Sequence, residues 1–156
     1  MKTTSQKIAI FCGEAIMLPL PIDHDKRHRK QADHNCELLH ENCFPDPCTV
    51  ENLKYKDWTT TVAFYSALHY IEAYLHFKGF RTKFDNHRER NDYLKNVASV
   101  QDKKINKILQ KYIELCNLSW TARYTACHYH YIDKNVLCKY VKFALLELPK
   151  ELSITL

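Results

Sequence analysis

Apolar residues recur at spacings of three and four over most of this chain, which is the periodicity of helices with one buried face. The first such segment begins at Asp23, a residue type that often caps helices, and it ends before a polar loop that contains Pro45 and Pro47. Its regularly spaced apolar positions are Ala32, Cys36, Leu39 and Cys43.

The strongest pattern runs from Trp58 to about Lys78. Asp57 is expected to cap the start of this helix, and Gly79 stands at the usual position after its end. The apolar stripe is wide enough to predict a central helix with neighbours on more than one side. Together with the aromatic residues of 124–131, it exceeds what a small bundle readily buries, which predicts a homodimer. The stripe comprises Trp58, Val62, Phe64, Tyr65, Ala67, Leu68, Ile71, Tyr74 and Leu75.

Further helices are predicted in the C-terminal half. A short helix covers 87–97, and Ser99 with Asp102 three residues later resembles a capping box that starts a second long helix. Asp133 is expected to cap the last helix, and Pro149 to close it.

No segment alternates as a half-buried strand would, no internal repeat occurs, and only two glycines are present in 156 residues. The sequence therefore predicts an all-α fold, a four-helix up-down bundle with an additional short helix, over residues 23–149. Residues 1–22 are expected to form an N-terminal arm and 150–156 a C-terminal tail. The scarcity of glycine also excludes phosphate-binding glycine loops.

Composition and charge narrow the choice of partners. The chain has 46% hydrophobic and 26% charged residues, as a globular protein does, and its formal net charge is +5. Basic residues cluster in Lys26–Lys30 and again between Arg81 and Arg90. This excess fits a partner rich in phosphate, although solvated helix faces would give the same clusters.

The cysteines and the N-terminal residues indicate the compartment. Seven cysteines without a paired framework are typical of free thiols in a reducing environment. The apolar segment 7–22 is interrupted by Glu14 and closed by Pro19 and Pro21, which leaves it too short to span a bilayer. We expect a cytoplasmic protein without a membrane segment, with secretion as the alternative.

Three segments resemble a known family. The stretch from Asp57 to Leu75 (DWTTTVAFYSALHYIEAYL) resembles the second helix of small bacterial and archaeal HEPN-domain proteins, and His87–Asn91 (HRERN) resembles their next loop–helix junction. The stretch Leu115–Tyr124, which ends in Ala-Arg-Tyr, resembles the end of their third long helix. The resemblance covers residues 23–149 in helix order. It implies an all-α bundle, frequent homodimerisation and, in many members, metal-independent RNA cleavage.

The catalytic signature of that family is an arginine followed by a histidine after four to six residues, and here Arg123 precedes both His128 and His130. A histidine can take a proton from an RNA 2′-hydroxyl, while arginine stabilises charge on the phosphoryl oxygens. On an unbroken helix His130 lies within about 20° of Arg123 and His128 about 140° away, whereas a break near Thr125 would favour His128. Active members usually carry a polar residue where Tyr124 stands. The alternative is a structural Arg123 that pairs with a carboxylate.

A second group of ionisable residues lies on the central helix. His69, Glu72 and His76 form a polar line beside the apolar stripe, and His87 and Arg90 share one face of the next helix. These positions predict either a binding pocket of His69, Glu72, His87 and Arg90, or a solvated face with one His–Glu contact.

Metal ligands are poorly spaced in the sequence. Cys36, His40, Cys43 and Cys48 are four candidate zinc ligands. Cys36 and Cys43 stand seven residues apart, about 10.5 Å along a helix, which is too far for both to bind one tetrahedral ion. His24 and His28 are a further pair at helical spacing, without a third ligand nearby in sequence. The sequence therefore predicts no metal and no cofactor.

Taken with the resemblance, these features predict a dimeric RNA-binding protein. Its finer form would be a metal-independent endoribonuclease of a toxin–antitoxin or defence system, with an antitoxin or another protein as partner. The alternatives are a non-catalytic HEPN adaptor and a module that binds a nucleotide or another small ligand at His69 and Glu72.

Overall fold

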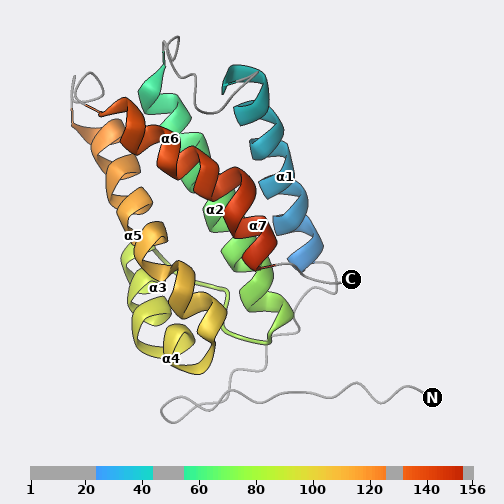
Figure 1. Cartoon of the computed structure of the whole chain (residues 1–156). Coiled ribbons are helices and arrows are strands. Elements are labelled where there is room, and N and C mark those ends of the chain that lie inside the picture. The colour runs from blue at the N-terminus through green and yellow to red at the C-terminus, as the bar shows by residue number, and fades with distance from the viewer. Residues whose placement is uncertain (1–23, 44–54, 126–131, 153–156) are drawn as a thin grey trace.

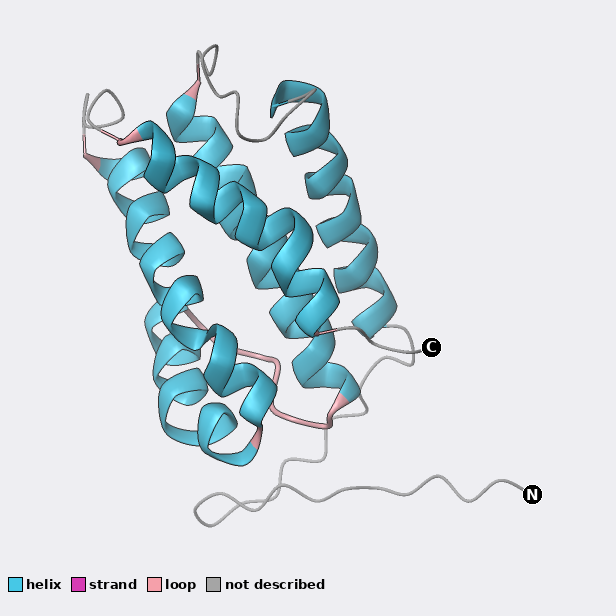
Figure 2. Cartoon of the chain, viewed as in Figure 1, coloured by secondary structure: helices cyan, strands magenta, loops and turns pink. Residues whose placement is uncertain are grey.

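The computed structural model describes residues 24–43, 55–125 and 132–152, and every element in these ranges is helical (Figures 1 and 2). This confirms the all-α prediction for the described part of the chain. No helix in these ranges is long and apolar enough to cross a membrane. In chain order the elements are α1 (His24–Cys43), α2 (Lys56–Phe77), α3 (His87–Tyr93), the π-helical turn η2 (Leu94–Ala98), α4 (Ser99–Gln101), α5 (Lys103–Tyr124), α6 (Lys134–Lys142), the π-helical turn η4 (Phe143–Glu147) and α7 (Leu148–Glu151).

Helix α2 is central, as its wide stripe predicts. Helices α1, α5 and α6 all pack against it, and consecutive long helices run in opposite directions (Figure 1). Every residue from Tyr70 to Leu75 is buried, which is possible only where neighbours surround the whole circumference of the helix.

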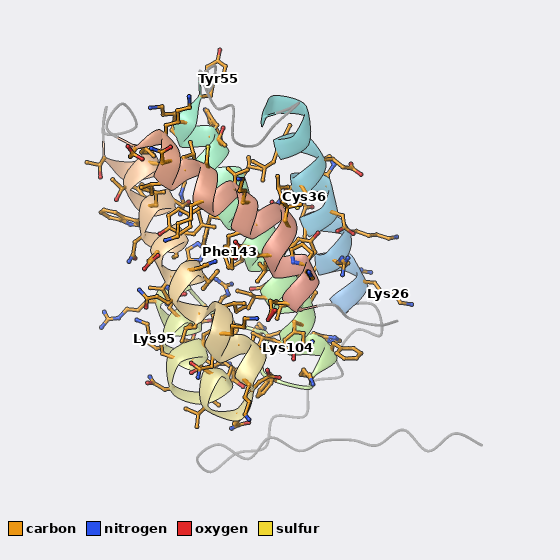
Figure 3. The ribbon with its side chains drawn as sticks, in the orientation of Figure 1. Lys26, Cys36, Tyr55, Lys95, Lys104 and Phe143 are labelled. Atoms are coloured by element: carbon orange, nitrogen blue, oxygen red, sulfur yellow. The ribbon has the colours of Figure 1, made fainter. Side chains whose placement is uncertain are left out.

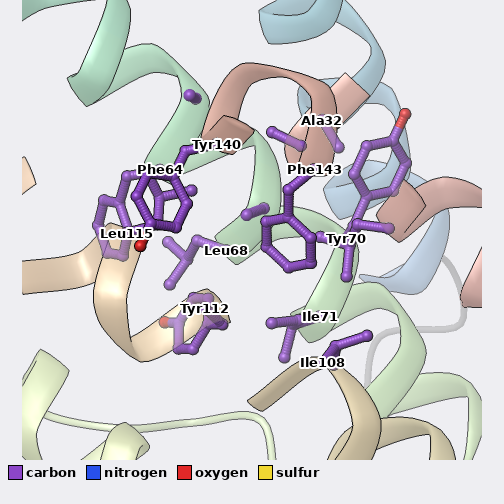
Figure 4. Packing of buried hydrophobic residues seen from close by; sticks show 14 of the residues in the cluster. Ala32, Phe64, Leu68, Tyr70, Ile71, Ile108, Tyr112, Leu115, Tyr140 and Phe143 are labelled. Atoms are coloured by element: carbon purple, nitrogen blue, oxygen red, sulfur yellow. The ribbon is translucent and has the colours of Figure 1, made fainter. Parts of the chain in front are cut away.

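The core lies between α2 and the helices that cover it. Phe64 of α2 stacks on Tyr112 of α5 with ring centroids 6.0 Å apart, and Leu115 lies in the same layer (Figure 4). Leu137 and Phe143 close the core from α6 and η4. Each of these side chains is 1% exposed or less, and full burial of one large apolar side chain contributes about 1.5–3 kcal/mol.

The α2 stripe is buried within the single chain. Phe64, Leu68, Ile71 and Leu75 are each at most 4% exposed, whereas Trp58 at the start of the helix is 65% exposed. The stripe is therefore not in excess of what one chain can bury, because α1, α5 and α6 together cover most of it, whereas residues 126–131, which entered the same expectation, lie outside the described residues. The stripe no longer supports a homodimer.

Polar contacts fix the rotation of α1 against α2. The Tyr70 hydroxyl donates to Asp33 Oδ1 at 2.7 Å, and the Cys36 thiol donates to the Tyr70 oxygen at 3.8 Å. The thiols of Cys36 and Cys116 are free, as predicted. Burial raises the pKa of the Cys36 thiol, so this group remains protonated and unreactive.

Two predicted helix starts differ in the structure. Asp102 alone caps α5, because its side chain accepts the backbone N–H groups of the first turn, whereas Ser99 belongs to the preceding helix and donates to the Lys95 carbonyl. Helix α2 begins before Asp57, with Tyr55 in the N-cap position and no side-chain cap. The predicted cap at Asp133 is confirmed by its bond to the Val136 N–H, and Asn86 caps α3 by accepting from the Glu89 N–H.

The C-terminal helix continues past the predicted stop. Pro149 stands in the first turn of α7, where a missing N–H does no harm, and the wider turn η4 precedes it. Leu152 is 2% exposed and belongs to the core. The folded unit therefore extends beyond the predicted boundary at 149, whereas the N-terminal arm and residues 153–156 lie outside the described residues.

Asp102→Ala should lower the free energy of unfolding by at least about 1–2 kcal/mol, since it removes a cap used by two backbone N–H groups and also the acceptor of the buried Tyr74 hydroxyl. Asp57→Ala is the matched control, and it should lower stability by at most about 1 kcal/mol, because Asp57 only interacts with the dipole of the first turn of α2. Urea unfolding monitored by circular dichroism measures both. Equal losses would contradict the assignment of Asp102 as the cap.

Candidate functional site

The centre of the candidate site is the carboxylate of Glu72, which is only 5% exposed. Its residue lies on α2 one turn after His69, and the periodicity of the helix turns both side chains toward α1 and α3. An ionised carboxylate so deeply buried needs cationic or hydrogen-bonding partners around it.

Two neighbouring helices supply those partners. Arg90 of α3 brings Nη2 to 2.6 Å from Glu72 Oε1. His28 of α1 brings Nδ1 to 3.1 Å from the other oxygen, Oε2. The same His28 Nδ1 lies 2.9 Å from His69 Nδ1, so the two imidazoles face each other beside the carboxylate.

The short helix α3 is held where it can present Arg90. Asn86 caps its first turn by accepting from the Glu89 N–H, and the Glu89 side chain in turn pairs with Arg81 and accepts from the Asp85 N–H. The Arg90 guanidinium then reaches Glu72 and lies 5.5 Å from the centre of the Phe84 ring.

A chain of contacts connects Arg90 with Arg123 through His87 and Tyr65. Arg90 Nη1 lies 2.9 Å from His87 Nδ1. The His87 ring packs edge-on against Phe64 at 5.3 Å and against Tyr65 at 6.4 Å. The hydroxyl of Tyr65 accepts a bond of 3.1 Å from Arg123 Nη1.

The environment alters the protonation of these groups. Burial lowers the pKa of His69, and Arg90 lowers it further. Burial likewise lowers the pKa of His87, with Arg90 and Arg123 adding to the effect. Burial raises the pKa of Glu72, while Arg90 opposes that rise. Both histidines are therefore neutral near pH 7 and offer a nitrogen lone pair.

Arg123 stands at the last turn of α5. Its Nε donates to the Ser119 carbonyl at 3.2 Å, and its guanidinium lies 5.1 Å from the centre of the Tyr124 ring. Both hydrogen-bond acceptors, the Ser119 carbonyl and the Tyr65 hydroxyl, are neutral. Among the described residues, no carboxylate pairs with Arg123, so the predicted structural alternative does not hold within them.

The structure thus brings together the predicted binding residues His69, Glu72, His87 and Arg90 in one contact network. The polar line is not a solvated face, because Glu72 is buried beneath α1 and α3. The predicted catalytic histidines His128 and His130 lie outside the described residues, as do Cys48 and the side chains of His40 and Cys43.

The sequence reasoning missed His28 and Tyr65 as members of this network. A signal for His28 existed, since it stands four residues before Ala32 and so continues the inward-facing positions of α1. His28 was difficult to recognise because it lies within the basic run Lys26–Lys30, in which Lys26, Arg27 and Lys30 are exposed.

Two of the four lysine and arginine residues in the second basic cluster pair with carboxylates within the chain. Arg81 pairs with Glu89, and Arg90 pairs with Glu72. Arg88, by contrast, is exposed. The count of basic residues between 81 and 90 therefore overstates the positive charge that this segment offers to a partner.

Comparison with known proteins adds no family assignment. The chain matches no family model, no curated protein and no solved structure.

Arg90→Met should lower the free energy of unfolding by about 3–5 kcal/mol at neutral pH, because it leaves the buried Glu72 carboxylate without its guanidinium partner. The pKa of Glu72, already raised by burial, should then rise further. A carboxyl whose folded-state pKa is raised loses stability as pH rises through that pKa, so the deficit of the variant should shrink toward about pH 5.

Arg88→Met is the matched control, since Arg88 lies on the same helix and is exposed. It should change stability by no more than about 0.5 kcal/mol at either pH. Chemical unfolding of the three proteins at both pH values measures the effect, and a deficit of Arg90→Met that does not depend on pH would contradict the role given to Glu72.

Proposed function

We propose that this chain is a HEPN-like four-helix up-down bundle with an additional short helix, that it forms a homodimer, and that it binds single-stranded RNA. The observation that carries the proposal is the position of Arg123 beside the exposed ring of Tyr124, which contacts the exposed ring of Trp120 at the end of α5. The dimer rests on the family resemblance of the sequence.

Two exposed aromatic rings lie near Arg123 in the last turns of α5. Trp120 and Tyr124, one turn apart on α5, are 59% and 65% exposed, with ring centroids 5.8 Å apart. Exposed rings are the platforms on which bases of single-stranded nucleic acid stack, and each stacked base contributes about 1–3 kcal/mol.

The start of α2 extends this surface. Figure 1 shows that α2 begins at the same end of the molecule at which α5 ends. Tyr55 and Trp58 are 58% and 65% exposed there, and Tyr55 points away from the bundle (Figure 3). Lys56 donates to the Ile132 carbonyl, which joins the start of α2 to the residues before α6.

Charge at this end favours a phosphate-bearing partner over an apolar one. The Arg123 guanidinium donates to neutral oxygens, so its charge is not cancelled by a described carboxylate. The whole chain carries a formal charge of +5. An arginine beside stacked rings can hold a phosphate while the rings hold the adjacent bases.

The finer proposal is metal-independent endoribonuclease activity, in the setting of a toxin–antitoxin or defence system. Arg123 would stabilise the charge on the phosphoryl oxygens, and His128 or His130 would take the proton from the 2′-hydroxyl. What supports this step is the sequence spacing, together with the free charge of Arg123.

The first test is binding. Fluorescence anisotropy with a labelled single-stranded RNA should show that Trp120→Ala weakens binding by about 5- to 150-fold, the equivalent of one stacked base. Arg123→Gln should reduce the dependence of log Kd on log salt by about one unit. Phe77→Ala is the matched control, because this 49% exposed ring lies at the opposite end of α2. If Phe77→Ala weakens binding as much as Trp120→Ala, the surface is not the RNA site.

The second test is cleavage. Purified protein should cut single-stranded RNA to products with cyclic phosphate ends, and a chelator should not stop it, since the 2′-hydroxyl is the nucleophile. Arg123→Ala should abolish cleavage, and His128→Ala should be more damaging than His130→Ala, because α5 ends at Tyr124 and a break at this point favours His128.

Tyr65→Phe tests whether Arg123 acts only through its structural contact with Tyr65, since the substitution removes the hydrogen bond to the guanidinium and keeps the ring. It should leave cleavage within about tenfold of the wild type. Intact RNA after incubation with wild-type protein between about pH 6 and pH 8 would refute the nuclease and favour the non-catalytic adaptor.

A further inference from the structure

The structure brings close to His28 two possible metal ligands that lie far from it in the sequence. His28 lies on α1, whereas His69 and Glu72 lie on α2, at i and i+3 of one helix face. One ligand atom from each of the three residues lies within 4.8 Å of the others. Side chains at this spacing on facing helices are a common way to build metal sites in the interiors of helical bundles.

We propose that His28, His69 and Glu72 form a binding site for Zn²⁺ or a related divalent transition-metal ion. The site is separate from the RNA surface and does not rest on the proposed function. It also differs from the expectation, based on sequence spacing, that the protein holds no metal.

The distances favour an ion of this class. His28 Nδ1 lies 2.9 Å from His69 Nδ1 and 3.1 Å from Glu72 Oε2. Around a tetrahedral zinc with ligands at about 2.1 Å, neighbouring ligand atoms are about 3.4 Å apart. Small side-chain rotations would therefore open room for the ion. Two imidazole nitrogens with one carboxylate oxygen suit zinc and its neighbours better than calcium or magnesium, which prefer oxygen ligands.

The hydrogen-bonding chemistry points the same way. His28 Nδ1 faces an imidazole nitrogen and a carboxylate oxygen together, and a neutral imidazole has at most one proton at that atom. A single proton serves only one of these contacts well. A divalent ion would satisfy all three atoms, with each imidazole proton on Nε2, the tautomer that leaves Nδ1 free to bind.

The surroundings would orient the ligands and admit the ion. Arg90 holds Glu72 by Oε1 and so directs Oε2 toward the histidines, as outer partners of metal ligands do. The side chain of His28 is 19% exposed, which gives an ion and a water molecule access from solvent. Three protein ligands with a fourth position open to water is the arrangement of zinc sites that bind exogenous molecules.

The test is titration of the full-length protein with Zn²⁺ and, as a spectroscopic probe, Co²⁺. One ion should bind per chain, and the Co²⁺ spectrum should show the intense visible bands of tetrahedral coordination without a thiolate charge-transfer band. The absence of a thiolate band distinguishes binding at this site from binding at any of the seven cysteines of the chain. His28→Gln and His69→Gln should each weaken binding by at least about a hundredfold, since loss even of an outer partner costs about 10- to 100-fold.

His34→Gln is the matched control. His34 also lies on α1 beside a glutamate, Glu37 at 3.9 Å, but its side chain is 72% exposed and is not part of the His28 cluster. This variant should bind like the wild type. If His69→Gln fails to fold, His28→Gln at the edge of the site still decides the matter. A thiolate band, unchanged affinity in both ligand variants, or no binding at all would overturn the proposal. Because metal binding is measured without RNA, failure of this proposal is distinguishable from failure of the RNA-binding proposal.

Discussion

The ion pair between Glu72 and Arg90 is the interaction on which the arrangement of the helices depends. Glu72 lies on α2, which is buried over its whole circumference from Tyr70 to Leu75, and an isolated charge there would cost several kcal/mol. Each helix near it therefore has to supply a compensating group. Helix α1 supplies His28, and α3 supplies Arg90.

This requirement explains why α3 has a defined place. None of its residues is fully buried, and only Tyr93 packs partly against the apolar core. The Asn86 cap, the Arg81–Glu89 pair and the bond from Arg90 into the core therefore contribute much of what fixes its position.

Periodicity predicted most of the helices, because burial of one face decides both the pattern and the fold. It failed at the starts of α2 and α5, where single hydrogen bonds compete. Ser99 and Asp102 both suit a cap, and only the path of the chain between α4 and α5 decides that Asp102 is the one used. Pro149 was likewise ambiguous, since a proline ends one helix and begins another equally well.

The candidate site was predictable only where one helix carries it. His69 with Glu72, and His87 with Arg90, follow from spacing on a single helix, and these residues do lie together. His28 could not be assigned to the group in this way, because its partner His69 stands 41 residues away in the chain. Charge counting was misleading for a related reason, since the pairing of Arg90 with Glu72 is a tertiary contact that no local pattern reveals.

The network also links the two proposed sites. Arg90 contacts Glu72 on one side and His87 on the other, and His87 shares the rings of Phe64 and Tyr65 with Arg123. A divalent ion on Glu72 would take up part of the negative charge that now balances Arg90. The end of the molecule near His87 and Arg123 would then become more positive and more attractive to phosphate. Because such coupling is reciprocal, bound RNA would strengthen metal binding by the same factor, so that occupancy of either site reports on the other.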